Sequence, residues 1–272
     1  MMTGFHQNYI GANQHREHDK QPLPHGVKPI PHLFEEAGYF TALMSWKTDC
    51  NFTPNTKAEL FMGEDWSERD SDQPFFARIT FGGTHRAFVR DPQRPIDIDD
   101  VELPPYYPDT PFCRRDWANG LETMQVVDRE IGDLLQRLED EGLAKKTIGF
   151  FIGDHGRCHI RGKQFLYDGG IRIPMVIRWP GHVSPGQVSD DLVMSIDICA
   201  TILEAAGITS PVPLHGESLF SDEVKERQYV FAARDKMDET HDAMRAIRSK
   251  EYKLILNLMP ERPWLQYNRY KE

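Results

Sequence analysis

Residues Thr147–Pro180 read TIGFFIGDHGRCHIRGKQFLYDGGIRIPMVIRWP, and this stretch decides the fold. Two apolar runs, Ile148–Ile152 and Met175–Trp179, have the length and composition of buried strands. Asp154 and His155 follow almost directly after the first run. Because ligands of open α/β sheets bind at the carboxyl ends of strands, the stretch predicts a carboxylate and an imidazole where chemistry takes place.

The polar segment between the two apolar runs carries a surplus of positive charge beside this carboxylate. The basic side chains are Arg157, His159, Arg161, Lys163 and Arg172. Four glycines in the same segment allow tight turns or a close approach to a ligand. This mixture suits a metal ion together with an anionic substrate group. The alternative is a charged surface loop with glycine turns, and residue types alone favour neither interpretation.

The order GDHG, then GK, then YDGGIRIPMVIRWPG resembles the sulfatase family of the alkaline-phosphatase superfamily. In that family a strand ends in Asp-Asn or Asp-His, a Gly-Lys follows, and Y-[DE]-G-G-x-R-x-P precedes the next strand. The resemblance implies an α/β fold, with a mostly parallel sheet flanked by helices and a small antiparallel C-terminal subdomain. We expect residues 1–222 to form the α/β domain and residues 223–272 to form the C-terminal subdomain.

Composition excludes some classes of partner. The net charge of −10 and pI near 5.6 argue against general binding to nucleic acid or acidic membranes. An anionic substrate therefore requires a local basic pocket. No apolar run has the length of a membrane helix, and no signal peptide is visible. The sequence indicates neither localisation nor oligomeric state.

The cysteines form no CxxC pair, which favours free thiols; they are Cys50, Cys113, Cys158 and Cys199.

Patterns outside the central stretch predict the remaining elements. The expected helices are Pro29–Ala37, Arg114–Gly142 and Ser195–Ala206, and further strands are expected at Tyr39–Ser45 and Phe75–Phe81. Apolar residues of the long helix recur at three- and four-residue steps and predict a core-facing stripe: Trp117, Leu121, Met124, Val127, Ile131, Leu134 and Leu138.

The proline-rich segment Val89–Pro111 is expected to be extended. The C-terminal part predicts three short strands, YVFAA, MRAIRS and YKLILN, with a hairpin turn at Lys250-Glu251. The segment ARDKMDET between the first two strands is predicted to be a charged loop.

The resemblance also suggests two residues that contact the reacting group. Lys47 stands where family members have a sulfate-contacting lysine, although Trp46 and Asp49 replace the Gly and His of their G-K-x-H. His85 stands where the family has a histidine that protonates the leaving group. The alternative interpretations are a solvated loop lysine and a structural histidine.

The same resemblance implies the other site residues. Asp154 and His155 would bind Ca²⁺, and Lys163 would hold the sulfate together with Lys47. Candidate substrate-binding residues are Arg86, Arg157, His159 and Arg234. Arg234 is included because ARDKMDET matches a loop that faces the substrate cleft in the family.

The family nucleophile is absent from this sequence. It is a formylglycine formed from the cysteine of C-x-P-S-R, and none of the four cysteines has a C-x-[PA]-x-R context. Thr3 and Gly4 match the Thr-Gly that follows this motif, so we expect a sulfatase without its N-terminal segment. Two metal-binding aspartates would then be missing as well. We therefore expect the given chain to be inactive and to bind Ca²⁺ weakly or not at all.

The resemblance points to a hydrolase of sulfuric esters or sulfamates, acting on a sulfated sugar. Overall likeness is closest to bacterial relatives of heparan N-sulfatase (sulfamidase), a family often periplasmic, secreted or lysosomal. One alternative is a non-catalytic sulfatase-like module that binds sulfated sugar. Another is a phosphonate or phosphodiester hydrolase of the same superfamily.

Overall fold

A computed structural model of the 272-residue chain describes all residues except 16–17, 46–47, 222–225, 238–239 and 266–272. The chain divides into two compact units. The first combines residues 1–80 with residues 189–272, and the second is residues 81–188. This division by compactness does not test the domain boundary expected at residue 222, which stays a prediction.

The first unit contains a parallel strand pair, as the sequence predicts. Strand β1 (Phe40–Met44) lies beside β2 (Phe75–Ile79), with Phe40 opposite Phe75. Helix α1 (Ile30–Glu36) precedes β1, and Gly38, at φ +88°, supplies the left-handed conformation that ends the helix. The connection from β1 to β2 contains α2 (Lys57–Leu60) and the 3₁₀ turn η1 (Trp66–Glu68).

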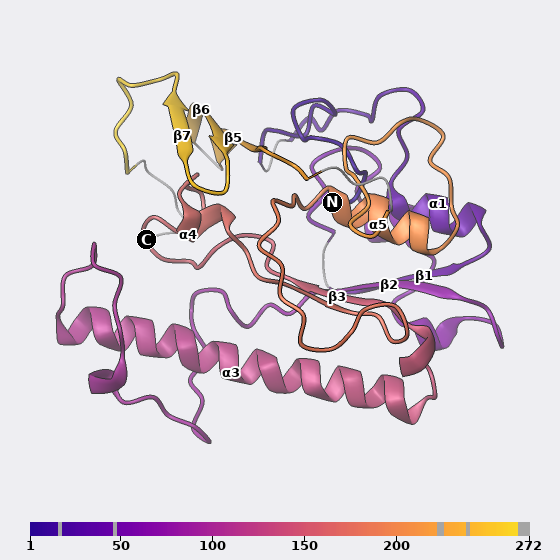
Figure 1. Cartoon of the computed structure of the whole chain (residues 1–272), viewed down its shortest axis with the longest axis horizontal. Helices are drawn as coiled ribbons and strands as arrows, with labels where there is room; N and C mark the ends of the chain where they lie inside the picture. Colours follow the sequence, from indigo (N-terminus) through magenta and orange to yellow (C-terminus); the bar gives the residue numbers. More distant parts are fainter. Residues whose placement is uncertain (16–17, 46–47, 222–225, 238–239, 266–272) are drawn as a thin grey trace. The chain divides into compact units, whose positions relative to one another are not determined.

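Apolar side chains from distant parts of the sequence form the core of this unit. Helix α5 (Asp197–Ala205) lies beside α1, as Figure 1 shows. Leu33 and Phe34 of α1 pack with Cys199 and Leu203 of α5, and all four are buried. The predicted helix at Ser195–Ala206 is therefore confirmed, and it packs into this core.

The C-terminal sheet is antiparallel, as expected. Its strands are β5 (Val230–Met237), β6 (Thr240–Arg248) and β7 (Lys253–Asn257), in that spatial order. The β6–β7 connection contains the predicted turn at Lys250-Glu251. The charged-loop prediction for ARDKMDET is wrong for Ala233–Met237, which belong to β5, and for Thr240, which begins β6; residues 238–239 lie outside the described residues. The Arg234 guanidinium lies 3.3 Å from the Asp242 carboxylate of β6, so these charges are paired across the strands.

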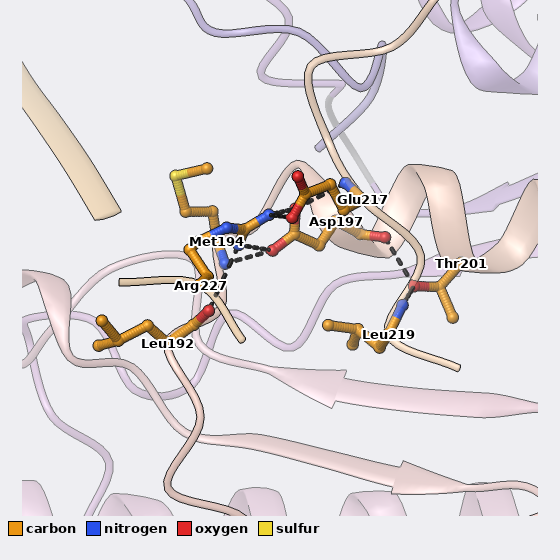
Figure 2. A network of polar contacts seen from close by, with 7 residues as sticks. All are labelled: Leu192, Met194, Asp197, Thr201, Glu217, Leu219 and Arg227. Atoms are coloured by element: carbon orange, nitrogen blue, oxygen red, sulfur yellow. Dashed lines mark hydrogen bonds and ion pairs between the residues drawn. The ribbon is translucent and has the colours of Figure 1, made fainter. Parts of the chain in front are cut away.

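One buried ion pair fixes the start of α5 (Figure 2). Both carboxylate oxygens of Asp197 accept hydrogen bonds from the Arg227 guanidinium, at 2.5 and 3.0 Å. The same carboxylate accepts the backbone N–H groups of Met194 (2.6 Å) and Glu217 (3.0 Å). The Asp197 side chain is 1% exposed, whereas that of Glu217, which also accepts from Arg227, is 62% exposed. Asp197 therefore joins three separate segments of the unit.

We expect Asp197→Ala to lower the free energy of unfolding by about 3–5 kcal/mol, because it removes the buried carboxylate that accepts two hydrogen bonds from Arg227 and leaves two backbone donors without an acceptor. Urea denaturation measures the change. Glu217→Gln is the matched control and should cost less than about 1 kcal/mol, because its carboxylate is exposed. Equal effects of the two substitutions would contradict this interpretation of the network.

Helix α3 (Pro111–Asp140) dominates the second unit (Figure 1). It begins three residues before the predicted start, because the Thr110 side chain accepts the Cys113 N–H and Pro111 occupies the first helical position. Of the predicted stripe, Val127 and Leu138 are buried, whereas Met124 is exposed. Although α3 is long, no helix among the described residues is both long and apolar enough to cross a membrane.

A buried carboxylate attaches the proline-rich segment to α3. Glu122 is fully buried and accepts Arg90 Nε at 2.6 Å. It also accepts the backbone N–H groups of Asp91 and Ile96, each at 3.0 Å. As predicted, this segment is largely irregular; its one helical element is the 3₁₀ turn η2 (Ile98–Asp100).

The two strands around the central segment pair with each other. The turn η3 (Ala144–Lys146) leads into β3 (Gly149–Ile152), and β4 (Met175–Arg178) runs antiparallel to it, with Gly149 opposite Arg178. This pair departs from the mostly parallel arrangement that we expected. Parallel neighbours usually need a crossover helix, and the segment between β3 and β4 contains only the one-turn helix α4 (Asp168–Ile171).

Candidate functional site

The segment between β3 and β4 folds back on itself through backbone hydrogen bonds. The Gly156 N–H donates to the Gly170 carbonyl at 2.9 Å, and the Lys163 N–H donates to the Arg157 carbonyl at 2.7 Å. A Cβ atom at Gly156 would lie 1.8 Å from the Gly169 carbonyl oxygen, and one at Gly170 would lie 2.1 Å from that of Phe165. Only glycine fits at these two positions, because the obstructing atoms belong to the backbone.

We expect Gly156→Ala to destabilise the chain by about 1–3 kcal/mol or more, because the segment must open to admit a methyl group. Thermal unfolding and limited proteolysis of residues 154–170 would show the change. Gly149→Ala is the control, since a Cβ there meets no atom within 4 Å. A Gly156→Ala chain as stable and as protease-resistant as the control would show that the close packing is absent in solution.

The folded segment brings together four of the groups that the sequence singles out. Lys163 Nζ lies 3.3 Å from His85 Nε2. The rings of His85 and His155 meet edge to face, with centroids 5.6 Å apart. Asp154 lies next to them, with its Oδ1 atom 3.6 Å from His155 Nε2, and its side chain is 78% exposed. His85 and Asp154 thus lie on the same side of this unit.

Cys158 is also part of this cluster, although its sequence context does not predict a role in the site. Its Sγ atom lies 4.0 Å from His85 Nδ1. Burial raises the pKa of the Cys158 thiol, and the positive charge of Lys163 opposes that shift only in part. The thiol is therefore poorly suited to act as a thiolate nucleophile. The contact with His85 could not be predicted from spacing, since the two residues lie 73 positions apart, whereas His155 stands only three residues before Cys158.

The contact between Lys163 and His85 assigns roles to both groups. A lysine ammonium has hydrogens to donate and no lone pair, so it donates to His85 Nε2. The neutral imidazole then carries its proton on Nδ1. This pair can bind an anion through the ammonium and transfer a proton through the imidazole, which are the requirements of hydrolysis at an anionic centre.

Arg86 positions the His85 segment against the folded segment. Its guanidinium forms a two-point contact with the Asp116 carboxylate of α3, at 2.8 and 2.6 Å. Its Nε donates to the carbonyl of Cys158 at 3.0 Å. The guanidinium is thus bound to protein groups, and its predicted role in substrate binding remains a prediction.

Arg157 lies over the Trp117 ring, with Cζ 4.7 Å from the ring centroid. Its Nη1 atom is buried and has no hydrogen-bond partner among the described residues. Burial lowers the pKa of the Arg157 guanidinium. A buried cationic donor of this kind would be stabilised by an anionic ligand, which is consistent with its predicted substrate-binding role.

His159 is buried between aromatic rings. Its ring lies 4.5 Å from the Trp117 ring and 5.4 Å from the Phe88 ring, centroid to centroid. Its Nε2 is 3.3 Å from Asp116 Oδ2, outside hydrogen-bond geometry, so the carboxylate acts on it mainly through charge. Burial is the dominant effect and lowers the pKa of His159 to about 4. A neutral imidazole that is 7% exposed can support the site, but little of its surface can contact a substrate.

The low pKa of His159 predicts a pH-dependent stability. Between pH 6.5 and about 4 the unfolded chain binds more protons at this residue than the folded chain. The contribution of the neutral His159 to the free energy of unfolding is therefore fully present above pH 6.5. It is lost as the pH falls toward 4, and the total loss is about 3 kcal/mol.

Acid unfolding of the wild type and of His159→Phe would isolate the contribution of His159. The variant should lose less free energy of unfolding than the wild type between pH 6.5 and 4. The exposed His182→Gln is the control and should behave as the wild type. An NMR titration that gives His159 a pKa near 6.5 would contradict the burial argument.

Two predicted residues cannot be placed in this cluster. Lys47 lies outside the described residues. Arg234 belongs to the first compact unit, where it pairs with Asp242.

The donors gathered in the cluster do not suit Ca²⁺. This ion takes six to eight oxygen ligands, usually with several carboxylates. Among the described residues, the group with three potential ligand atoms close together is His85, His155 and Cys158, which offers nitrogen and sulfur. Asp154 adds one exposed carboxylate. We derive no catalytic step through Ca²⁺, and weak Ca²⁺ binding stays a prediction.

Sequence comparison identifies relatives over most of the chain. Residues 47–208 match the family model described as Sulfatase, and residues 153–272 match that of the C-terminal part of N-sulphoglucosamine sulphohydrolase. An ulvan-active sulfatase from Formosa agariphila is 28% identical over 99% of this chain and 54% of its own length. Human N-sulphoglucosamine sulphohydrolase is 26% identical over 97% of this chain and 62% of its own length. The chain thus spans between half and two thirds of these two relatives.

Solved structures with the same fold confirm the predicted fold class. A 2-O GAG sulfatase superposes with a TM-score of 0.72 at 18% identity, covering 94% of this chain and 71% of the other. A phosphonate monoester hydrolase from Silicibacter pomeroyi superposes with a TM-score of 0.74 at 18% identity, covering 94% and 76%. These similarities establish the alkaline-phosphatase-like α/β fold.

Proposed function

Because the chain belongs to the sulfatase family, we propose that it forms the sulfate-binding part of a hydrolase that acts on sulfated sugars. The observation that carries the proposal is the contact of Lys163 with His85 at 3.3 Å. Lys163 is expected to bind an oxygen of the sulfate. His85 is expected to protonate the leaving oxygen or nitrogen of the sugar.

We further propose a sulfamidase-like substrate, an N-sulfated or O-sulfated amino sugar. The C-terminal family match and the human relative support this choice. Arg157 adds a half-buried positive charge to the same segment, directly after the Asp154–Gly156 turn. Together, Lys163 and Arg157 give this segment the local positive charge that an acidic protein needs for an anionic ligand.

The nucleophile of such a hydrolase would have to come from residues beyond the 272, because no cysteine here has the formylglycine context. We therefore expect the 272-residue chain to bind sulfated sugar without hydrolysing it. Turnover of a sulfate ester or sulfamate above a heat-killed control would contradict this expectation. An in-frame C-x-P-S-R in the coding sequence before Met1 would favour an enzyme, and its absence would favour the non-catalytic binding module.

Binding of glucosamine N-sulfate to the chain tests the proposed role of Lys163. Calorimetry should show that Lys163→Met lowers the affinity for glucosamine N-sulfate by about 10–100-fold, because the substitution removes one charge-assisted hydrogen bond. Lys146→Met is the matched control, since this lysine is exposed on η3, and it should change the affinity less than twofold. Equal effects of both substitutions would exclude Lys163 as the sulfate ligand.

The same experiment with phenylphosphonate separates the second candidate function. The structural likeness to a phosphonate monoester hydrolase keeps a phosphonate or phosphodiester substrate open. A chain that binds the phosphonate at least tenfold more tightly than the sulfated sugar would favour that alternative.

A further inference from the structure

We propose that His85, His155 and Cys158 form a binding site for a divalent transition metal ion of the Zn²⁺ type. The three side chains each offer one ligand atom, and these atoms lie within 4.8 Å of one another. All three side chains are half-buried, so an ion could enter while losing part of its water shell. This proposal does not depend on the proposed function.

The spacing is close to that of a tetrahedral site. With Zn–N and Zn–S bonds of typical length, ligand nitrogen and sulfur atoms lie about 3.6 Å apart. The observed distance from Cys158 Sγ to His85 Nδ1 is 4.0 Å. Small side-chain rotations would therefore bring both atoms onto one ion.

The types of donor select the ion. Thiolate and imidazole suit Zn²⁺ and Co²⁺, whereas Ca²⁺ and Mg²⁺ prefer oxygen. Three protein ligands would leave a fourth position for water or an anion. The cluster is thus a candidate for a metal different from the one that the strand-end Asp154–His155 pair predicts.

Neighbouring groups already orient two of the ligands. His155 Nδ1 lies 2.7 Å from the Gly156 carbonyl, which leaves Nε2 as its metal-binding atom. The Cys158 carbonyl accepts Arg86 Nε, so the backbone that carries the sulfur is fixed beside the segment that carries His85. Hydrogen bonds of this kind hold ligands in position before the ion arrives.

Lys163 opposes the metal and gives the proposal its sharpest test. Its ammonium donates to His85 Nε2, so Nδ1 carries the proton in the metal-free chain. An ion on Nδ1 would move that proton to Nε2, where an N–H would face the ammonium. Metal binding and the Lys163–His85 contact are therefore mutually exclusive. Removal of the lysine should strengthen metal binding.

Titration of the 272-residue chain with Co²⁺ tests the site, because a cobalt–thiolate bond produces a charge-transfer absorption that nitrogen and oxygen ligands do not. We expect one Co²⁺ per chain, with this absorption, displaced by Zn²⁺. Cys158→Ser should abolish the absorption and weaken binding at least tenfold. Cys113→Ser is the control from the same compact unit and should leave both unchanged.

Two further variants separate the site from nonspecific binding. His155→Gln should lower the affinity for Co²⁺ at least tenfold, while the cobalt–thiolate absorption persists when the site is saturated. Lys163→Met should raise the affinity for Co²⁺ at least threefold. Under the proposed function, the same substitution lowers the affinity for glucosamine N-sulfate. Absence of stoichiometric binding, an absorption that survives Cys158→Ser, or weaker Co²⁺ binding by Lys163→Met would overturn the proposal. Failure of sulfate binding alone would overturn only the proposed function.

Discussion

The candidate site depends on a backbone contact that only glycine allows. The segment after β3 returns so closely on itself that a Cβ at Gly156 would lie 1.8 Å from the Gly169 carbonyl oxygen. The backbone hydrogen bond from Gly156 to Gly170 closes this turn. Without that approach, Lys163 would not be held opposite the strand end that carries Asp154 and His155. The arrangement of the candidate site therefore depends on glycine at positions 156 and 170.

Charge is distributed unevenly in this acidic chain. Several carboxylates are committed to structure, since Glu122 holds the proline-rich segment, Asp116 holds Arg86, and Asp197 holds Arg227. Lys163 and Arg157 instead accompany histidines and a tryptophan ring. A net charge of −10 is therefore compatible with local affinity for an anion, because screening limits the effect of exposed charges farther than about 10 Å away.

Much of the fold could be predicted from local patterns. The strands on either side of the central segment and the three-stranded C-terminal sheet follow from short apolar runs, and α5 follows from its helical period. The segment that holds Lys163 was identified from its motif order, and its position near His85 follows from a family resemblance. Strand direction was harder to predict, because the antiparallel pairing of β3 with β4 depends on how their connection folds.

Long-range contacts explain the remaining errors and omissions. Cys158 contacts His85, a residue distant in sequence, and its H-x-x-C spacing from His155 alone does not predict that contact. The charged sequence around Arg234 predicts a loop, because charge usually indicates exposure to solvent, yet Asp242 on the neighbouring strand allows Arg234 to be buried. The sequence pattern counts His159 among the basic side chains, but its burial among aromatic rings favours the neutral form.

The most direct test of the proposed site is a crystal structure of the chain with bound glucosamine N-sulfate. We predict the sulfate within hydrogen-bond distance of Lys163 Nζ and the sulfamate nitrogen facing His85. A sulfate bound elsewhere, with the contact between Lys163 and His85 undisturbed, would contradict the central claim.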